Sequence, residues 1–195
     1  MLRELRTSLL MLIVLTLVTG VAYPLLVTGV ARVAFPRQAG GSLVVAGGSV
    51  VGSSLLGQSF ADAGHFWSRP AATGVPYDAS ASSGSNLGPT NPARLAAIVD
   101  RVAALHAADP GNTAPVPADL VTASASGLDP HISPFAAEYQ LARVARIRGI
   151  DPARLRALVT QCTEPRTFGF LGEPRVIVMA LNRARDAPNH PGGSR

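Results

Sequence analysis

Hydrophobic residues are concentrated at the start of the chain, where residues 8–30 contain no charged side chain. A helix needs about 20 apolar residues to cross the core of a bilayer, and it satisfies its own backbone hydrogen bonds there. A cleaved secretory signal has a shorter apolar region of about 7–15 residues and ends at a small-x-small site, which this run lacks. The pattern therefore predicts an N-terminal tail at residues 1–7 and an uncleaved transmembrane anchor helix at residues 8–34, kinked at Pro24.

Two short runs rich in β-branched residues follow, at residues 43–46 and 50–53. Gly47 and Gly48 lie between them, and such a pair favours the tight turn of a hairpin. Residues 57–91 show little periodicity and consist mostly of small and turn-forming residues. Their aromatic residues are Phe60, Phe66, Trp67 and Tyr77. Because disordered linkers are poor in aromatic residues, we expect an ordered loop held in place by these rings.

Three helices are predicted further along, each introduced by the same pair of residues. An Asn, Ser or Asp that can cap the first amides precedes a proline, which suits the first helical turn. These pairs are Asn91-Pro92, Ser133-Pro134 and Asp151-Pro152. The first helix is expected to end at Asp109, and the second at Gly149. The apolar residues at helical spacing in the first helix are Leu95, Ile98, Val99, Val102 and Leu105.

A last apolar run, residues 175–180, predicts a strand, and residues 186–195 are polar and predict a flexible tail. The expected fold class is α+β: a single transmembrane helix followed by one small body, residues 35–185, of about three helices and a few strands. The length is sufficient for one body with a hydrophobic core.

Composition excludes several classes of function. All 17 residues counted as Lys or Arg are arginine, so the chain lacks the lysine that a P-loop NTPase requires. The net charge of +5 suggests an anionic partner, but the arginines are scattered, so we read the charge as a compositional habit and expect no nucleic-acid partner. The single cysteine, Cys162, excludes an intramolecular disulfide and a multi-cysteine zinc site, and we interpret it as a small core residue.

Residues 83–91 form the first stretch that could carry chemistry. Ser83, Gly84, Ser85 and Asn86 allow close backbone approach and supply hydroxyl and amide groups, directly before a helix N-terminus that favours negative charge. One interpretation is a site for a phosphate or a partner loop. The alternative, which the chemistry alone favours, is a rigid turn that caps its own helix.

Residues 119–134 form the second such stretch. Ser124 or Ser126 with His131 could serve a membrane-anchored serine hydrolase, although the Gly-x-Ser-x-Gly motif is absent. Asp129 and His131 could be two metal ligands, but no third ligand is evident nearby, and we expect no metal site. The structural alternative, which we favour, is a turn in which Asp129 caps backbone amides and His131 bonds to the loop.

Four stretches occur together in one order behind the anchor: residues 56–60, 66–70, 83–91 and 119–134. In this arrangement the chain resembles the C subunit of the Kdp potassium-transporting P-type ATPase, the KdpC family. The phrases Ser-Asn-Leu-Gly-Pro-Thr-Asn and Ser-Gly-Leu-Asp-Pro-His-Ile-Ser-Pro carry most of the resemblance, which extends to residues 172–176 and 181–182.

The resemblance implies an accessory subunit without catalytic activity in an ATP-driven, high-affinity potassium import complex. Its implied partners are a channel-like potassium-binding subunit, a P-type ATPase subunit and the lipid bilayer. The family is needed for assembly and has been proposed to act as a catalytic chaperone that raises the ATP affinity of the ATPase subunit. The corresponding nucleotide or partner-loop candidates are Ser83, Gly84, Ser85 and Asn86. The further motif candidates for turns and interfaces are Gln58, Arg69, Asn91, Asp129 and His131.

The resemblance also implies a location in the bacterial inner membrane with a single crossing and the body on the outer face. Arg3 and Arg6 precede the anchor while Arg32 and Arg37 follow it, so the positive-inside rule gives no orientation by itself. A body on the outer face cannot reach ATP directly. We therefore expect no bound cofactor, and ATP only through the ATPase subunit.

Overall fold

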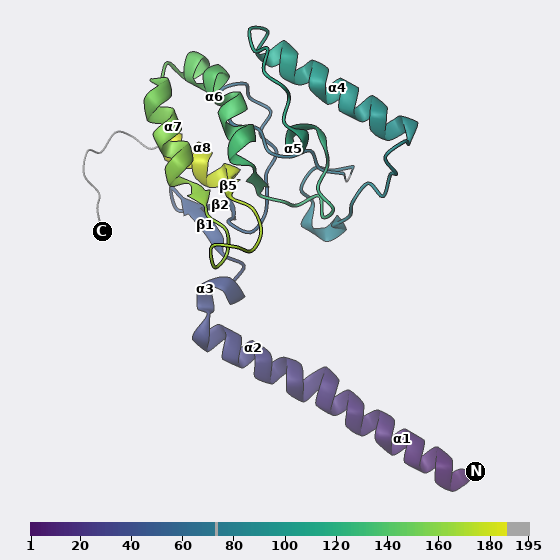
Figure 1. Ribbon diagram of the computed structural model, residues 1–195. Coiled ribbons are helices and arrows are strands. Elements are labelled where there is room, and N and C mark those ends of the chain that lie inside the picture. The colour runs from purple at the N-terminus through teal and green to yellow at the C-terminus, as the bar shows by residue number, and fades with distance from the viewer. Residues whose placement is uncertain (73, 187–195) are drawn as a thin grey trace. The chain divides into compact units, whose positions relative to one another are not determined.

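The computed structural model describes residues 1–72 and 74–186, and the chain forms two compact units (Figure 1). The first is Met1–Ser53 and the second begins at Ser54. Together they give an apolar N-terminal helix and a body of helices with short antiparallel strands, which confirms the α+β fold class. Apart from Asp186, the predicted tail lies outside the described residues.

The first unit begins with one continuous helix, built from α1 (Leu2–Leu17), a π-helical segment (Val18–Ala22) and α2 (Tyr23–Ala34). By length and composition it is able to cross a membrane. The π-helical segment ends two residues before Pro24. A proline cannot donate a backbone hydrogen bond within a helix, and a π turn changes the hydrogen-bond partners in the turn that precedes it. A short helix, α3 (Pro36–Ala39), follows.

The predicted hairpin is confirmed at the end of this unit. Strands β1 (Leu43–Ala46) and β2 (Ser49–Ser53) pair antiparallel with Ala46 opposite Ser49. Gly47 and Gly48 both have positive φ, at 58° and 82°, as the two central residues of this tight turn require.

Within residues 54–72 and 74–186, the described part of the second unit, four helices have eight or more residues. The predicted helices are confirmed as α4 (Pro92–Ala108), α6 (Pro134–Arg148) and α7 (Pro152–Gln161), each with its Asn, Ser or Asp side chain accepting a backbone amide. Gly149 ends α6 at φ 63°. A fourth long helix, α8 (Val178–Asp186), and the single-turn α5 (Ala118–Val121) were not predicted.

The predicted strand at residues 175–180 is wrong in its second half. Strand β5 covers only Arg175–Ile177, and α8 begins at Val178. Val178, Leu181 and Asn182 repeat at helical spacing and are all buried. The burial of this helix face therefore outweighs the strand preference of the β-branched residues, which had predicted a longer strand.

A small antiparallel sheet has the strand order β3 (His131–Ile132), β5, β4 (Thr163–Glu164), and α6 and α8 contact its middle strand. Helix α6 packs against α7 and β5, as Figure 1 shows, and most of its residues are buried. In contrast, α4 buries only Leu105, while Leu95 and Val99 of its apolar series are 50% and 65% exposed.

In residues 57–72 and 74–91 the long loop after β2 is ordered, as predicted, and it is held by more than its aromatic rings. Phe66 is buried, and its backbone N–H and C=O both bond to the side-chain amide of Asn182, at 2.9 and 3.0 Å. Gln140 binds the backbone of Trp67 in the same way, at 2.8 and 3.2 Å. Two amide side chains thus supply the hydrogen bonds that a neighbouring strand would otherwise provide to these backbone N–H and C=O groups.

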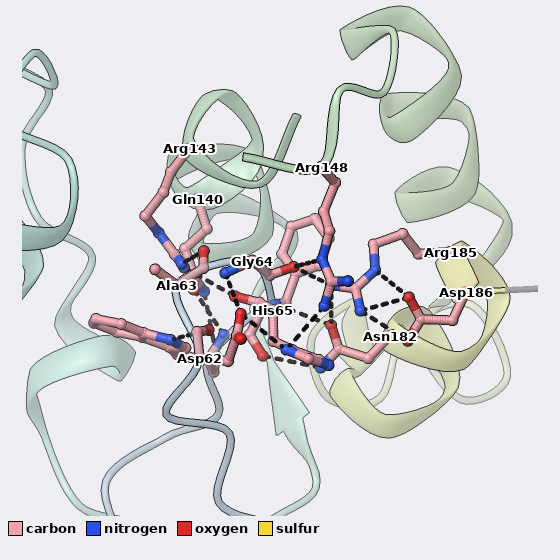
Figure 2. A network of polar contacts seen from close by, with 12 residues as sticks. Asp62, Ala63, Gly64, His65, Gln140, Arg143, Arg148, Asn182, Arg185 and Asp186 are labelled. Carbon is pink, nitrogen blue, oxygen red and sulfur yellow. Dashed lines mark hydrogen bonds and ion pairs between the residues drawn. The ribbon is translucent and has the colours of Figure 1, made fainter. Parts of the chain in front are cut away.

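Arginines complete the support of this loop (Figure 2). Arg143 donates to the carbonyl oxygens of Ala63 and His65, and Arg185 and Arg148 both donate to the carbonyl of Gly64. Burial lowers the pKa of Arg143 to about 10, so it stays charged at neutral pH. Its charge is met by carbonyl dipoles, by Gln140 and by the ring of Trp67, whose centroid lies 4.5 Å from the guanidinium carbon.

Candidate functional site

The four stretches singled out in the sequence come together in the fold. Residues 122–131, hereafter the central segment, run from the end of α5 to the first residue of β3 and bind two of the other stretches by backbone hydrogen bonds. Gly57 donates its N–H to the carbonyl of Leu128 at 2.9 Å, and Ser83 donates to the carbonyl of Ser126 at 3.1 Å. The central segment therefore joins residues that are distant in sequence.

Close backbone packing explains the glycine of the first stretch. A Cβ atom on Gly57 would lie 2.2 Å from the Tyr77 ring and 2.7 Å from the carbonyl oxygen of Asp129, distances that no side chain tolerates. The Tyr77 hydroxyl in turn donates to the carbonyl of Arg69 at 2.5 Å. Gln58 lies beside this contact, and its carbonyl accepts a hydrogen bond from the Ser68 hydroxyl at 2.8 Å.

A short chain of charged groups links the second and fourth stretches. Arg69 Nη1 lies 2.9 Å from Asp129 Oδ2, and Asp129 Oδ1 lies 3.0 Å from both the backbone N and the ring Nδ1 of His131. Burial raises the pKa of Asp129, but hydrogen bonds from His131 and Arg69 outweigh that effect and lower the pKa from 3.8 to about 2. The carboxylate caps a turn, which is the structural alternative that the sequence favoured.

The Ser83–Asn86 stretch packs its backbone against the central segment while its side chains stay exposed. A Cβ atom on Gly84 would lie 3.0 Å from the carbonyl oxygen of Ala125. Ser85 and Asn86 border a pocket of about 440 Å³, which also contains Arg94 and Arg101 of α4. Burial lowers the pKa of Arg101, whose guanidinium donates to the carbonyl of Val121 at 2.8 Å.

Asn86 itself has φ 51°, a left-handed conformation that few residues other than glycine and asparagine adopt readily. Asn91 serves as the cap of α4, because its side-chain oxygen accepts the amide of Ala93 at 2.9 Å. The loop is thus fixed at both ends, by backbone packing at Gly84 and by the cap at Asn91. Its exposed groups are presented by a rigid turn.

The serines of the central segment have structural partners. The Ser124 hydroxyl is buried and accepts the amide of Gly127 at 2.9 Å, and the Ser126 hydroxyl accepts the amide of Leu128 at 3.2 Å. A serine hydrolase needs its nucleophile bonded to a base, but in the described part of the chain neither serine hydroxyl bonds to the ring of His131. The geometry therefore gives no support to the hydrolase interpretation.

Across residues 1–72 and 74–186, no group of three or more His, Cys, Asp or Glu side chains is close enough to hold a metal ion. Asp129 and His131, the pair considered from the sequence, are occupied with each other and with Arg69.

Three residues that contribute to the site were missed, wholly or in part, from the sequence. Tyr77 was expected only to hold the long loop, and it also packs on Gly57 and bonds to Arg69. Arg94 and Arg101 were not singled out, although their spacing of seven residues in a predicted helix places them on the same face.

The whole chain was compared with known proteins. The family described as "K+-transporting ATPase, c chain" (KdpC) matches residues 5–187. A protein of Polaromonas naphthalenivorans named potassium-transporting ATPase KdpC subunit is 63% identical over 192 residues, covering 96% of this chain and 98% of its own. Proteins with the same name from Variovorax paradoxus and Methylococcus capsulatus are each 62% identical, covering 93% and 96% of this chain and 95% and 99% of theirs. The chain therefore belongs to the KdpC family, the c chain of the K⁺-transporting ATPase.

Proposed function

We propose that the chain is a non-catalytic accessory subunit of an ATP-driven, high-affinity potassium import complex, and that it is needed for assembly. Its partners would be the channel-like potassium-binding subunit and the P-type ATPase subunit. The observation that supports this proposal best is the convergence of three sequence stretches, residues 56–60, 66–70 and 83–91, on the central segment, which belongs to the fourth. Their polar groups are used to hold backbone together, which suits a rigid binding surface rather than a reaction centre.

The exposed loop Ser83–Asn86 is the part of that surface proposed to touch a partner. It lies beside a pocket containing the guanidinium groups of Arg94 and Arg101, so it would suit a partner loop that carries an acidic side chain. Contact there could change the ATP affinity of the ATPase subunit through the membrane, as a coupling between distant sites. Direct ATP binding by the body is not part of the proposal.

We further propose that residues 8–34 cross the bacterial inner membrane once and that the body, residues 35–185, lies on the outer face. The apolar helix Leu2–Ala34 supports the crossing. Membership of the KdpC family supports the orientation, because the resemblance implies a body on the outer face.

The orientation can be tested by thiol labelling. Cys162 is replaced by alanine and a new cysteine is placed at Ala157, an exposed position on α7 outside the candidate site. An impermeant maleimide is expected to label this cysteine in intact cells as strongly as after lysis. The Cys162→Ala chain without the new cysteine is the control, and labelling only after lysis would contradict an outer body.

The role of the loop can be tested at Asn86. Replacing Asn86 with glycine keeps the left-handed backbone accessible but removes the exposed amide. We expect the body to stay folded, while recovery of the complex falls or the ATP concentration for half-maximal potassium-stimulated hydrolysis rises by about fivefold, a usual size for such couplings.

Asn86→Ala serves as the comparison, because it removes the same amide and adds backbone strain. If the amide touches a partner, both variants impair the complex. Suppose that the complex containing Asn86→Gly assembles and hydrolyses ATP normally, while Asn86→Ala only lowers the melting temperature of the body. The residue then merely shapes the turn, and the proposed contact is wrong. Reduced recovery would indicate an assembly surface, whereas a shifted ATP requirement with intact assembly would indicate coupling.

A further inference from the structure

The connection between β4 and β5, residues 165–174, forms a closed turn, hereafter the phenylalanine hairpin. Thr167 and Leu171 pair across it as an antiparallel bridge. Within the turn, Gly169 donates its N–H to the carbonyl of Arg166 at 3.0 Å, and Leu171 donates to the carbonyl of Thr167 at 2.9 Å. The tip is therefore fixed by backbone hydrogen bonds.

This ordered tip exposes large apolar side chains. Phe168 is 84% exposed, Phe170 is 69% exposed and Leu171 is 49% exposed. Single exposed hydrophobic residues are ordinary, but a group of them on one surface marks a contact with something else. Aromatic side chains are also the residue class that most often anchors protein interfaces.

The backbone at the tip is unusual as well. Phe168 has φ 54°, in the left-handed region that bulky residues seldom adopt. Gly169 and Gly172, with φ of 81° and 76°, can adopt such conformations without strain. Strained residues of this kind tend to occur where function requires a particular presentation of a side chain, and here the side chain presented is a fully apolar ring.

Charges around the hairpin distinguish between classes of partner. Arg166 pairs with Glu173 at 2.5 Å, and Arg175 pairs with Glu164 at 2.9 Å. The cations nearest the tip are thus neutralised within the body, whereas segments that bind the surface of an anionic membrane present free basic residues beside Trp or Tyr. The hairpin instead suits an uncharged, apolar cavity in a protein.

The size of the patch excludes a second copy of this chain as its occupant. An aromatic side chain buries about 150–250 Å², while a stable interface needs about 800 Å² from each partner. Three side chains cannot hold a dimer by themselves, but they can anchor one point of a complex that other contacts also hold.

We propose that the phenylalanine hairpin inserts Phe168 and Phe170 into an uncharged apolar pocket of another subunit of the transporter, an inference that rests on the function proposed above. The contact is separate from the Ser83–Asn86 loop, whereas the base of the hairpin lines a pocket together with Asp129 and His131 of the central segment. It would fix the body against its partner by apolar burial, independently of the membrane helix.

The test uses the full-length chain and its complex. Phe168 and Phe170 are both replaced by asparagine, which is polar and tolerates positive φ at residue 168. The variant is expected to keep its melting temperature within about 3 °C, since an exposed side chain contributes little to folding, and to lose at least tenfold in recovery of the other subunits from mild detergent. The matched control is Phe135→Asn, because Phe135 is similarly exposed, on α6, and its replacement should leave recovery unchanged.

A photo-crosslinking benzophenone amino acid at residue 168 then identifies the occupant. A crosslink to another subunit of the transporter supports the proposal, whereas a crosslink mainly to lipid or to a second copy of this chain overturns it. Unchanged recovery of the double variant also overturns it. These outcomes differ from failure of the proposed function, in which the unaltered chain itself would recover no transporter subunits.

Discussion

Replacing Arg143 with methionine is expected to remove at least about 3 kcal/mol from the free energy of unfolding, a large part of the total of about 5–15 kcal/mol for a domain. Arg143 is 2% exposed, and its guanidinium donates to the carbonyls of Ala63 and His65 and to the side chain of Gln140. Methionine fills a similar volume but removes the donors to the two carbonyls, at about 1–3 kcal/mol each, whereas the Gln140 oxygen keeps the hydrogen bond from the backbone of Trp67. It also removes the cation that lies over the Trp67 ring.

Thermal unfolding of the full-length chain in mild detergent measures this effect. Arg154→Met is the matched control, because Arg154 lies exposed on α7 and its loss should change the melting temperature by less than about 2 °C. Arg143→Lys should fall between the two, since a lysine keeps the charge but cannot reach all the acceptors of the planar guanidinium. A melting temperature for Arg143→Met equal to that of the control would show that the carbonyl contacts contribute nothing.

Replacing Gly57 with alanine is expected to be nearly as damaging, although it adds only one methyl group. That methyl would overlap the Tyr77 ring and the carbonyl oxygen of Asp129, so the loop must move away from the central segment. Overpacking usually costs about 1–3 kcal/mol, and here the obstacle includes backbone. We expect a loss of about 3 kcal/mol and a melting temperature lower by roughly 10 °C.

Gly111→Ala is the control for this substitution, because a Cβ atom on Gly111 meets no atom within 4 Å and its φ is not positive. A second test combines Gly57→Ala with Tyr77→Ala. If the ring is the main obstacle, the two changes together cost less than the sum of their separate effects. Strict additivity, or an unchanged melting temperature in Gly57→Ala, would mean that the close approach is unimportant.

Local signals in the sequence were sufficient to place three of the long helices. Asn91, Ser133 and Asp151 were predicted as caps from their position before proline, and each accepts a backbone amide in the structure. Such caps act within a few residues of chain, so their effect can be read locally. The hairpin at Gly47-Gly48 was predictable for the same reason, since two successive glycines favour the left-handed turn.

Helix α8 lacked any such signal. Its first residues continue the β-branched run of β5, and neither a proline nor a capping residue separates them. What makes these residues helical is the burial of Val178, Leu181, Asn182 and Arg185 on one face. That burial depends on segments far away in the sequence, which local reasoning cannot place.

At the candidate site, too, the local features could be predicted from the sequence and the long-range contacts could not. The stretches themselves were recognisable, but their joining at the central segment was not, because it depends on backbone contacts such as that between Gly57 and Leu128. The pairing of Asp129 with His131 was predictable from their proximity in sequence, whereas the addition of Arg69 required the fold.

The amide clamp on Phe66 has a consequence for the biogenesis of the protein. Its partner, Asn182, lies 116 residues further along the chain, so a ribosome working at about 5–20 residues per second needs on the order of 10 seconds between them. Throughout that interval the backbone of Phe66 lacks the amide side chain that binds it in the folded protein, while the apolar helix Leu2–Ala34 has already been synthesised. The body must therefore complete its folding after synthesis is nearly finished, and a stop codon before residue 182 would leave the N-terminal helix attached to a segment that cannot close its core.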